Sequence, residues 1–138
     1  MKPTITPTIA PLPGFRAAGV HCGLKAADAL DFALIVSDSE AVTAGVFTVN
    51  TIKAAPVLVN QETLAANPTG IRAVAINSGC ANACTGDTGI DNALATAACV
   101  ADALGCAPES VLVLSTGVIG TQLPMNKIAT GVEQAAAT

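Results

Sequence analysis

The chain has 138 residues, of which 51% are hydrophobic and only 2% aromatic, and its net charge is −4. Six scattered lysines and arginines with almost no aromatic rings argue against nucleic-acid binding, which needs cations along the phosphates and often stacking rings. No apolar run reaches membrane-spanning length, and the first seven residues lack the apolar core of a signal peptide, so a cytoplasmic protein without membrane contact is expected. The length suits one domain over residues 1–138, with the proline-containing residues 1–13 as an extended arm.

The first half of the chain predicts short strands separated by turns. The clearest strand places Phe32, Leu34 and Val36 at alternate positions, which puts them on one face. In chain order we expect a strand over 29–37, a turn over 38–40, a strand over 41–48, a short strand over 56–60, one or two helical turns over 61–66, a turn over 67–70 and a strand over 71–77.

The second half predicts two helices around another strand. A helix over 87–104 is indicated by an apolar stripe at helical spacing, with Gly105 as its left-handed cap. The stripe consists of Ile90, Leu94, Ala97, Ala98, Ala101 and Leu104. A buried strand follows over 111–114, and a second helix is expected to begin near Pro124. Because strands precede most of the helices, the fold class is α/β.

A threonine–glycine pair follows the 111–114 strand. We predict that the strand ends in a tight glycine turn over residues 115–120. Thr116 can offer its hydroxyl and Gly117 its N–H, two neutral donors suited to the oxyanion that develops during acyl transfer. On the pattern alone, a plain structural turn is the competing interpretation.

A second glycine-rich segment, residues 77–86, also follows an apolar strand. The amides of Asn77 and Asn82 are candidates for bracing the same site. The alternative is that they cap a turn and support the helix that follows, where Asp87 and Asp91 look like first-turn acids rather than general bases.

The chain has five cysteines and one histidine, the residues that could form disulfides, a metal site or a catalytic Cys–His pair. An odd cysteine count without a signal peptide indicates free thiols in a reducing compartment. The spacing of Cys80 and Cys84 is wide for a zinc knuckle, so no metal is expected. His21 next to Cys22 would point away from it in a strand, so a catalytic Cys–His pair is also disfavoured.

Ordered motifs along almost the whole chain resemble the ornithine acetyltransferase (glutamate N-acetyltransferase) family of arginine biosynthesis. Beside the two glycine-rich segments, they are Gly14-Phe15-Arg16-Ala17-Ala18-Gly19-Val20 with Gly23-Leu24-Lys25, Ala44-Gly45-Val46-Phe47-Thr48-Val49-Asn50, Ala54-Ala55-Pro56-Val57 and Leu123-Pro124-Met125-Asn126-Lys127-Ile128. One departure is Cys80, where the family more often has asparagine.

The resemblance implies a layered helix–sheet–sheet–helix fold shared between an α and a β chain, of which this sequence would be the front part of α. It implies ping-pong transfer of acetyl from N-acetylornithine to glutamate, with acetyl-CoA left open as a second donor and no bound cofactor. Thr116 and Gly117 would form the oxyanion hole. The nucleophile would be a threonine freed by self-cleavage beyond residue 138, because Thr138 lacks the glycine, methionine and proline residues expected before the cut. The expected partner is the β chain, in an α2β2 heterotetramer.

Two alternatives from other classes remain open at this point. One is a non-catalytic fragment that completes a partner chain, and the other is a self-processing, aminopeptidase-like hydrolase. Substrate-binding residues are not identified by the sequence, and Lys25 and Lys53 are more simply solvated surface lysines.

Overall fold

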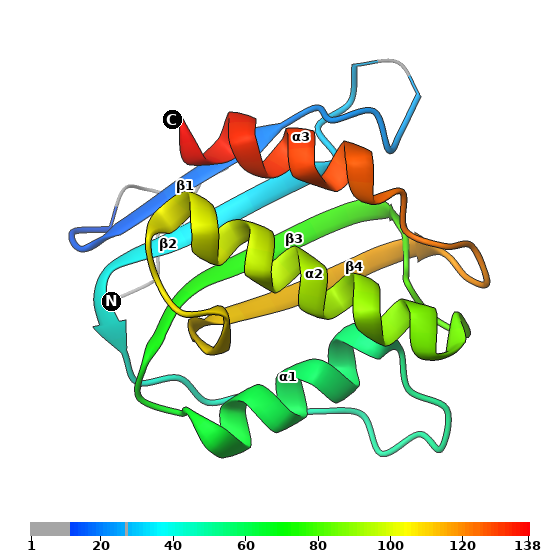
Figure 1. The fold of residues 1–138 in the computed structure, drawn as a ribbon, viewed down its shortest axis with the longest axis horizontal. Coiled ribbons are helices and arrows are strands. Elements are labelled where there is room, and N and C mark those ends of the chain that lie inside the picture. Colours follow the sequence, from blue (N-terminus) through cyan, green and yellow to red (C-terminus); the bar gives the residue numbers. More distant parts are fainter. Residues whose placement is uncertain (1–11, 27) are drawn as a thin grey trace, which may run out of the picture.

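The computed structural model describes residues 12–26 and 28–138, so most of the expected N-terminal arm lies outside the described residues. After two consecutive strands, the elements alternate between helices and strands, which confirms the α/β class (Figure 1). In chain order they are β1 (Phe15–Val20), β2 (Phe32–Ala41), α1 (Ala55–Ala66), β3 (Ile71–Cys80), α2 (Gly86–Leu104), the short 3-10 helix η1 (Pro108–Ser110), β4 (Val111–Val118) and α3 (Met125–Ala136).

The strands form one sheet in the order β1-β2-β3-β4. β1, β2 and β3 are antiparallel neighbours, whereas β3 and β4 are parallel. A parallel pair needs a crossover, and α2 supplies it between β3 and β4. The carboxyl ends of β3 and β4 therefore meet at one edge of the sheet, the usual place for a ligand site in an α/β fold.

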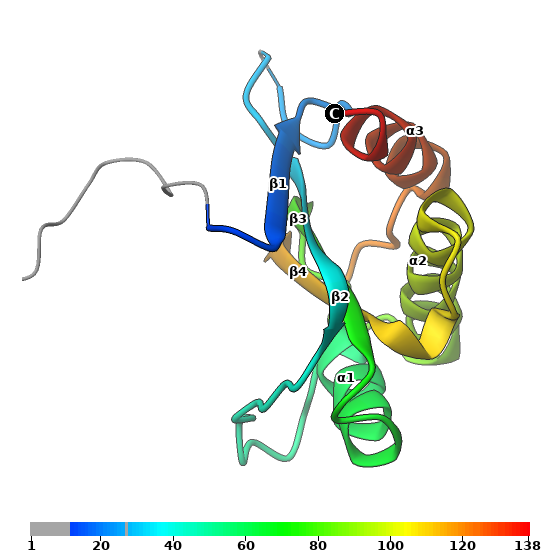
Figure 2. The same ribbon diagram turned by 90° about the vertical axis from the view of Figure 1, so that its left-hand side faces the viewer.

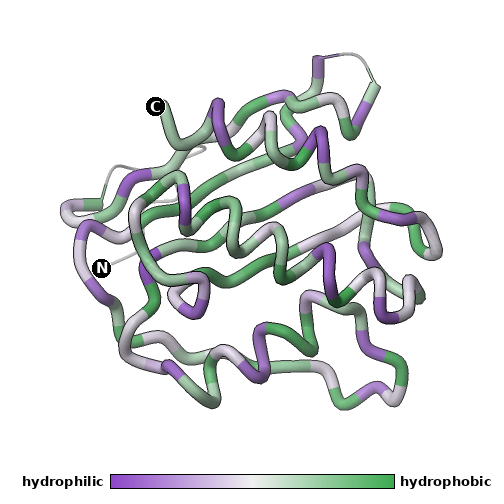
Figure 3. Tube along the Cα trace, in the orientation of Figure 1, coloured by the Kyte–Doolittle hydropathy of each residue, from purple (hydrophilic) through white to green (hydrophobic). Residues whose placement is uncertain are grey.

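Helices α2 and α3 cover one face of the sheet, and the other face points away from them (Figure 2). On the covered face, Phe32, Leu34 and Val36 of β2 are buried, as the alternating pattern predicted. Hydrophobic residues run through the strands beneath these helices (Figure 3). The described residues thus form one helix layer and one sheet of the expected four-layer arrangement.

Helix α1 closes the edge of β4 rather than the face of the sheet. Asn60, which is buried, donates from Nδ2 to the Val113 carbonyl at 2.8 Å and accepts the Val113 N–H at 3.0 Å. These two bonds occupy backbone groups that an edge strand would otherwise leave open.

The expected short strand over 56–60 is wrong, because these residues form the first half of α1. Pro56 lies in the first helical turn, where its fixed φ and missing N–H cost nothing. A short run of apolar residues is compatible with either element, and its periodicity does not decide between them.

The expected strand over 41–48 and the turn before it are also wrong. Residues 38–40 continue β2, with a register irregularity between Val36 and Ala41 in place of a turn. After Ala41 the chain leaves the sheet, and Val42, Val46 and Val49 are almost fully exposed. Because β2 is already paired with β1 and β3, this segment cannot fold back on β2 as a hairpin, and among the described residues it joins no sheet.

Helix α2 confirms the predicted helix and its cap, with Gly105 in the left-handed conformation at φ 66°. Its buried face is rotated from the predicted stripe. Ala97 and Ala101 are buried as expected, but Leu94 is half exposed, and Ala93 and Val100 take the inner positions. Small inner residues allow the helix to lie close to the sheet. Within the described residues, no helix is both long enough and apolar enough to span a membrane.

Helix α3 begins directly after Pro124, as predicted, and buries Ile128 and Val132. Gly131 lies against Phe32, where an added Cβ would be 2.9 Å from the ring. The glycine therefore allows close contact between α3 and β2, which offsets its low helix propensity.

Candidate functional site

The two glycine-rich segments lie side by side at the carboxyl ends of β3 and β4. Ser78 pairs with Thr116 and Gly79 with Gly117 in the parallel ladder. The predicted turn at Thr116 and Gly117 is wrong, because β4 continues through both residues to Val118. Pairing with β3 extends the strand past the apolar run from which its end was predicted.

Gly117 occupies a position that only glycine fits. Its φ is +134°, and an added Cβ would overlap the Gly79 backbone and lie 2.6 Å from the Cys80 nitrogen. Gly79 also has a positive φ, +117°. Two glycines side by side let the strands approach closely while turning their peptide groups away from regular strand geometry.

Thr116 is exposed and lies on the open face of the sheet. Val111 and Val113 point to the helices and are buried, so alternation places Leu114 and Thr116 on the opposite face. The Thr116 side chain is therefore on the face of the sheet opposite to α2 and α3.

Two backbone bonds hold the segments together beyond the ladder. The Ala81 N–H donates to the Val118 carbonyl at 2.9 Å, and the Gly120 N–H donates to the Ala83 carbonyl at 2.8 Å. The carboxyl ends of β3 and β4 thus leave the sheet together, which fixes the backbone around Thr116.

Asn77 and Asn82 are both buried, and their amides bond inside their own segment. Asn77 donates to the Cys80 carbonyl at 2.8 Å. Asn82, fully buried, donates to the Gly89 carbonyl at 2.8 Å and accepts from the Thr85 hydroxyl at 2.8 Å. These bonds shape the connection from β3 into α2, which is the capping alternative considered for the sequence. Asp87 lies in the first turn of α2 as predicted, whereas Asp91 lies one turn further along.

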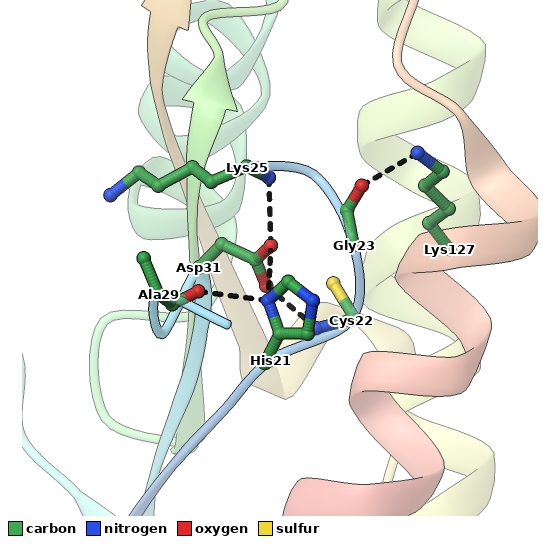
Figure 4. A network of polar contacts seen from close by, with 7 residues as sticks. All are labelled: His21, Cys22, Gly23, Lys25, Ala29, Asp31 and Lys127. Atoms are coloured by element: carbon green, nitrogen blue, oxygen red, sulfur yellow. Dashed lines mark hydrogen bonds and ion pairs between the residues drawn. The ribbon is translucent and has the colours of Figure 1, made fainter. Parts of the chain in front are cut away.

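The loop that carries the Gly23-Leu24-Lys25 motif, which was not predicted to lie at the site, also reaches it. Between β1 and β2, the backbone of Leu24 lies against Gly79, where an added Cβ would be 3.1 Å from the Leu24 oxygen. The buried carboxylate of Asp31 holds this loop by accepting N–H bonds from Cys22 at 2.7 Å and Lys25 at 2.8 Å (Figure 4). An acid directly before an apolar strand, after a glycine-containing loop, is the signal that could have identified it.

The His21–Cys22 pair follows β1 rather than lying within it, and both residues meet Asp31. His21 Nδ1 is 3.3 Å from Asp31 Oδ2 and 2.9 Å from the Ala29 carbonyl. Since both neighbours are acceptors, Nδ1 carries the hydrogen. Burial, together with the Asp31 carboxylate, raises the pKa of Cys22 to about 11. Such a thiol stays protonated at neutral pH and is a poor nucleophile.

Burial of Asp31 by itself would raise its pKa, but the N–H bonds from Cys22 and Lys25 outweigh this effect and lower the pKa to about 2. The group is therefore a carboxylate at any physiological pH. Burial also raises the pKa of Cys99 and Cys106. All five cysteines are free thiols, and residues 12–26 and 28–138 contain no group of three possible metal ligands.

Comparison with known proteins matches residues 16–138 to the ArgJ family. "Arginine biosynthesis bifunctional protein ArgJ" of Thermotoga neapolitana is 52% identical over 122 residues, and that of Geobacter sulfurreducens is 48% identical over 119. These matches cover 88% and 86% of this chain but 30% of each relative.

Two solved structures share the fold. An arginine biosynthesis bifunctional protein argJ from Bacillus halodurans has a TM-score of 0.85 at 41% identity. An ornithine acetyltransferase complexed with ornithine, from Mycobacterium tuberculosis, has a TM-score of 0.86 at 47% identity. Each match covers 91% of this chain and about two thirds of the other chain. The resemblance seen in the motifs is confirmed, and the chain belongs to the ArgJ family.

Proposed function

We propose that this chain supplies the oxyanion-stabilising part of an acetyltransferase that moves acetyl from N-acetylornithine to glutamate in arginine biosynthesis. The observation that carries the proposal is the Thr116–Gly117 pair on the open face, with Gly117 in a conformation reserved for glycine. Family membership and the likeness to an ornithine acetyltransferase complexed with ornithine support it.

In the proposed chemistry, a nucleophilic hydroxyl adds to the acetyl carbonyl of N-acetylornithine, whose oxygen gains negative charge. The amide C–N bond then breaks, ornithine leaves with the proton taken from the hydroxyl, and the acetyl group stays on the nucleophile as an ester until the glutamate amine displaces it. The Thr116 hydroxyl and the Gly117 N–H donate to that oxygen in the tetrahedral intermediate, and again when glutamate takes the acetyl group. Donors that are already in place before the charge develops lower the barrier because they need not reorganise.

The nucleophile is proposed to lie outside this chain, on a threonine freed by self-cleavage of a longer precursor. Its own α-amine would serve as the base. The partner is then the β chain of the same precursor, in an α2β2 assembly in the cytoplasm, seated on the open face where Thr116 lies. The proposal includes acetyl-CoA as a possible second donor of the acetyl group that glutamate receives.

An activity assay with and without the remainder of the protein tests this. The chain alone should not transfer acetyl from N-acetylornithine to glutamate, whereas co-expression with a segment carrying the nucleophile should restore transfer. Robust turnover by the 138 residues alone would contradict the placement of the nucleophile. Failure of every ArgJ-derived segment to restore transfer, with binding demonstrated, would favour a non-catalytic role.

A further inference from the structure

A buried carboxylate lies beside the proposed site without a part in the chemistry described above. Asp31 is only 2% exposed, and its side chain is fully shielded from solvent. A charge in such a place is costly unless several hydrogen bonds satisfy it. Asp31 has those bonds, and all of them go to one loop, residues 21–25.

The bonds of Asp31 close this loop and attach it to the sheet. Its side chain accepts the N–H groups of Cys22 and Lys25, and the His21 ring lies at 3.3 Å (Figure 4). Its main chain adds two more bonds. The Asp31 N–H donates to Val20 at 3.0 Å, and its carbonyl accepts the Ser78 N–H at 2.8 Å.

The loop in turn supports the glycines of the site. Leu24 lies against Gly79 so closely that an added Cβ would be 3.1 Å from its oxygen. Gly79 pairs with Gly117, where an added Cβ would overlap the Gly79 backbone. Three backbone segments are therefore stacked in contact: the loop, Gly79 of β3 and Gly117 of β4.

We propose that Asp31 is a positioning residue for the Thr116–Gly117 site. Its carboxylate fixes the 21–25 loop, the loop holds the Gly79 peptide in place, and Gly79 sets the position of the Gly117 N–H. The inference rests on the proposed oxyanion role of Thr116 and Gly117. Since a displacement of about 1 Å in such a site can cost about 100-fold in rate, a support of this kind affects turnover without contacting the substrate.

A purely structural role for Asp31 makes a different prediction. Loss of a structural bond would lower stability and the amount of mature enzyme, but each correctly folded molecule would keep its turnover. A positioning role lowers kcat per active molecule and leaves KM nearly unchanged, because oxyanion contacts strengthen only near the transition state.

The test is Asp31→Asn in the full-length protein, which keeps the size of the side chain but removes its charge and one acceptor. Asp38→Asn is the matched control, because Asp38 lies in β2, the strand that Asp31 directly precedes, but is exposed and pairs with Arg16 at 3.3 Å. With rates normalised to active molecules, kcat should fall about 10- to 100-fold in Asp31→Asn, with KM within about threefold, and stay near wild type in Asp38→Asn.

A double-mutant cycle with Thr116→Ala shows whether the effect passes through the site. If it does, Asp31→Asn should cost far less in the Thr116→Ala background than in the wild type, because the Thr116 hydroxyl and the Gly117 N–H act on one oxyanion as a unit, and that unit is already impaired. Additive effects, or an unchanged kcat in Asp31→Asn while Thr116→Ala is slow, would overturn the inference and leave the proposed function standing. An unchanged kcat in Thr116→Ala would overturn both.

Lys127→Met decides the question if Asp31→Asn does not fold. Lys127 is exposed, and its Nζ donates to the Gly23 carbonyl at 2.6 Å, so it holds the same loop from helix α3 (Figure 4). Its loss should lower kcat about two- to fivefold, again non-additively with Thr116→Ala. An unchanged kcat in that folded variant would overturn the inference.

Discussion

The amino-terminal and carboxyl-terminal halves of the paired strands β3 and β4 share one parallel ladder but differ in burial and in residue type. In the first half, Ala73, Ala75, Val111 and Val113 are at most 3% exposed and pack beneath the helices. In the second half, the ladder passes through Ser78 and Gly79 opposite Thr116 and Gly117, and β4 is exposed. The change occurs within a few residues of the same strands.

The buried half of the two strands therefore contributes to stability, and the exposed half carries the proposed chemistry. The buried half is held by apolar contacts, which are non-directional and tolerate small adjustments. The second half continues the register of the first, so its strands stay paired although few apolar contacts hold them. Its glycines allow the peptide groups to turn away from regular strand geometry. Donors set on a rigid strand are held more accurately than donors on a free loop.

The largest effect is expected from Gly117→Ala. The new methyl group would overlap the Gly79 backbone at a φ that L-residues avoid, so the strands must separate. Acetyl transfer and self-cleavage in the full-length protein should fall more than about 100-fold. Gly120→Ala is the control, because its φ is also positive but no atom lies within 4 Å of the added Cβ. Equal losses in the two variants would show that backbone strain alone, and not the close approach to Gly79, matters.

Ile128→Ala should lower stability without lowering turnover. Ile128 is fully buried on α3, so truncation leaves a cavity and should lower the free energy of unfolding by about 2–5 kcal/mol. The kcat per folded molecule should stay near wild type, because Ile128 belongs to the apolar core beneath α3 and not to the ladder between β3 and β4. Denaturant unfolding and active-site-normalised kinetics check both parts, and a selective loss of kcat would show that the core and the ladder are not separable.

The pH dependence of stability should give a smaller but specific effect at Asp31. Its folded pKa, about 2, lies below the ordinary value of 3.8, so its contribution is fully present above pH about 4 and is lost as the pH falls toward 2. The titratable groups that face the Asp31 carboxylate are the His21 ring and the Cys22 thiol. The stability difference between wild type and Asp31→Asn should therefore shrink over that interval. A difference that stays constant from pH 5 to pH 2 would contradict the ionised, hydrogen-bonded carboxylate.

Sequence patterns predicted the elements whose burial is one-sided. The alternation of Phe32, Leu34 and Val36 and the cap at Gly105 were correct because each depends on local geometry. The segments over 41–48 and 56–60 were wrong because β-branched apolar residues suit several elements, and the number of strand partners decides between them. That number is a property of the whole sheet.

The site was predictable only in part. Thr116 and Gly117 were identified from a local pattern and a resemblance, yet their place inside a strand depends on pairing with β3. Asp31 was missed because its partners, the backbone N–H groups of Cys22 and Lys25, are nine and six residues away. Backbone donors leave no residue-type signal of their own, so the place of Asp31 directly before an apolar strand and after a glycine-containing loop is what distinguishes it from other acids.

The most direct test of the proposed role is the turnover of Thr116→Ala in the full-length protein. Thr121→Ala is the matched control, an exposed threonine five residues further along the same segment. With N-acetylornithine and glutamate as substrates, Thr116→Ala should lower kcat about 100- to 1,000-fold with little change in KM, because it removes one oxyanion donor. Thr121→Ala should stay near wild type. A normal kcat and normal maturation in Thr116→Ala would contradict the oxyanion role and leave this exposed end of β4 as a structural feature.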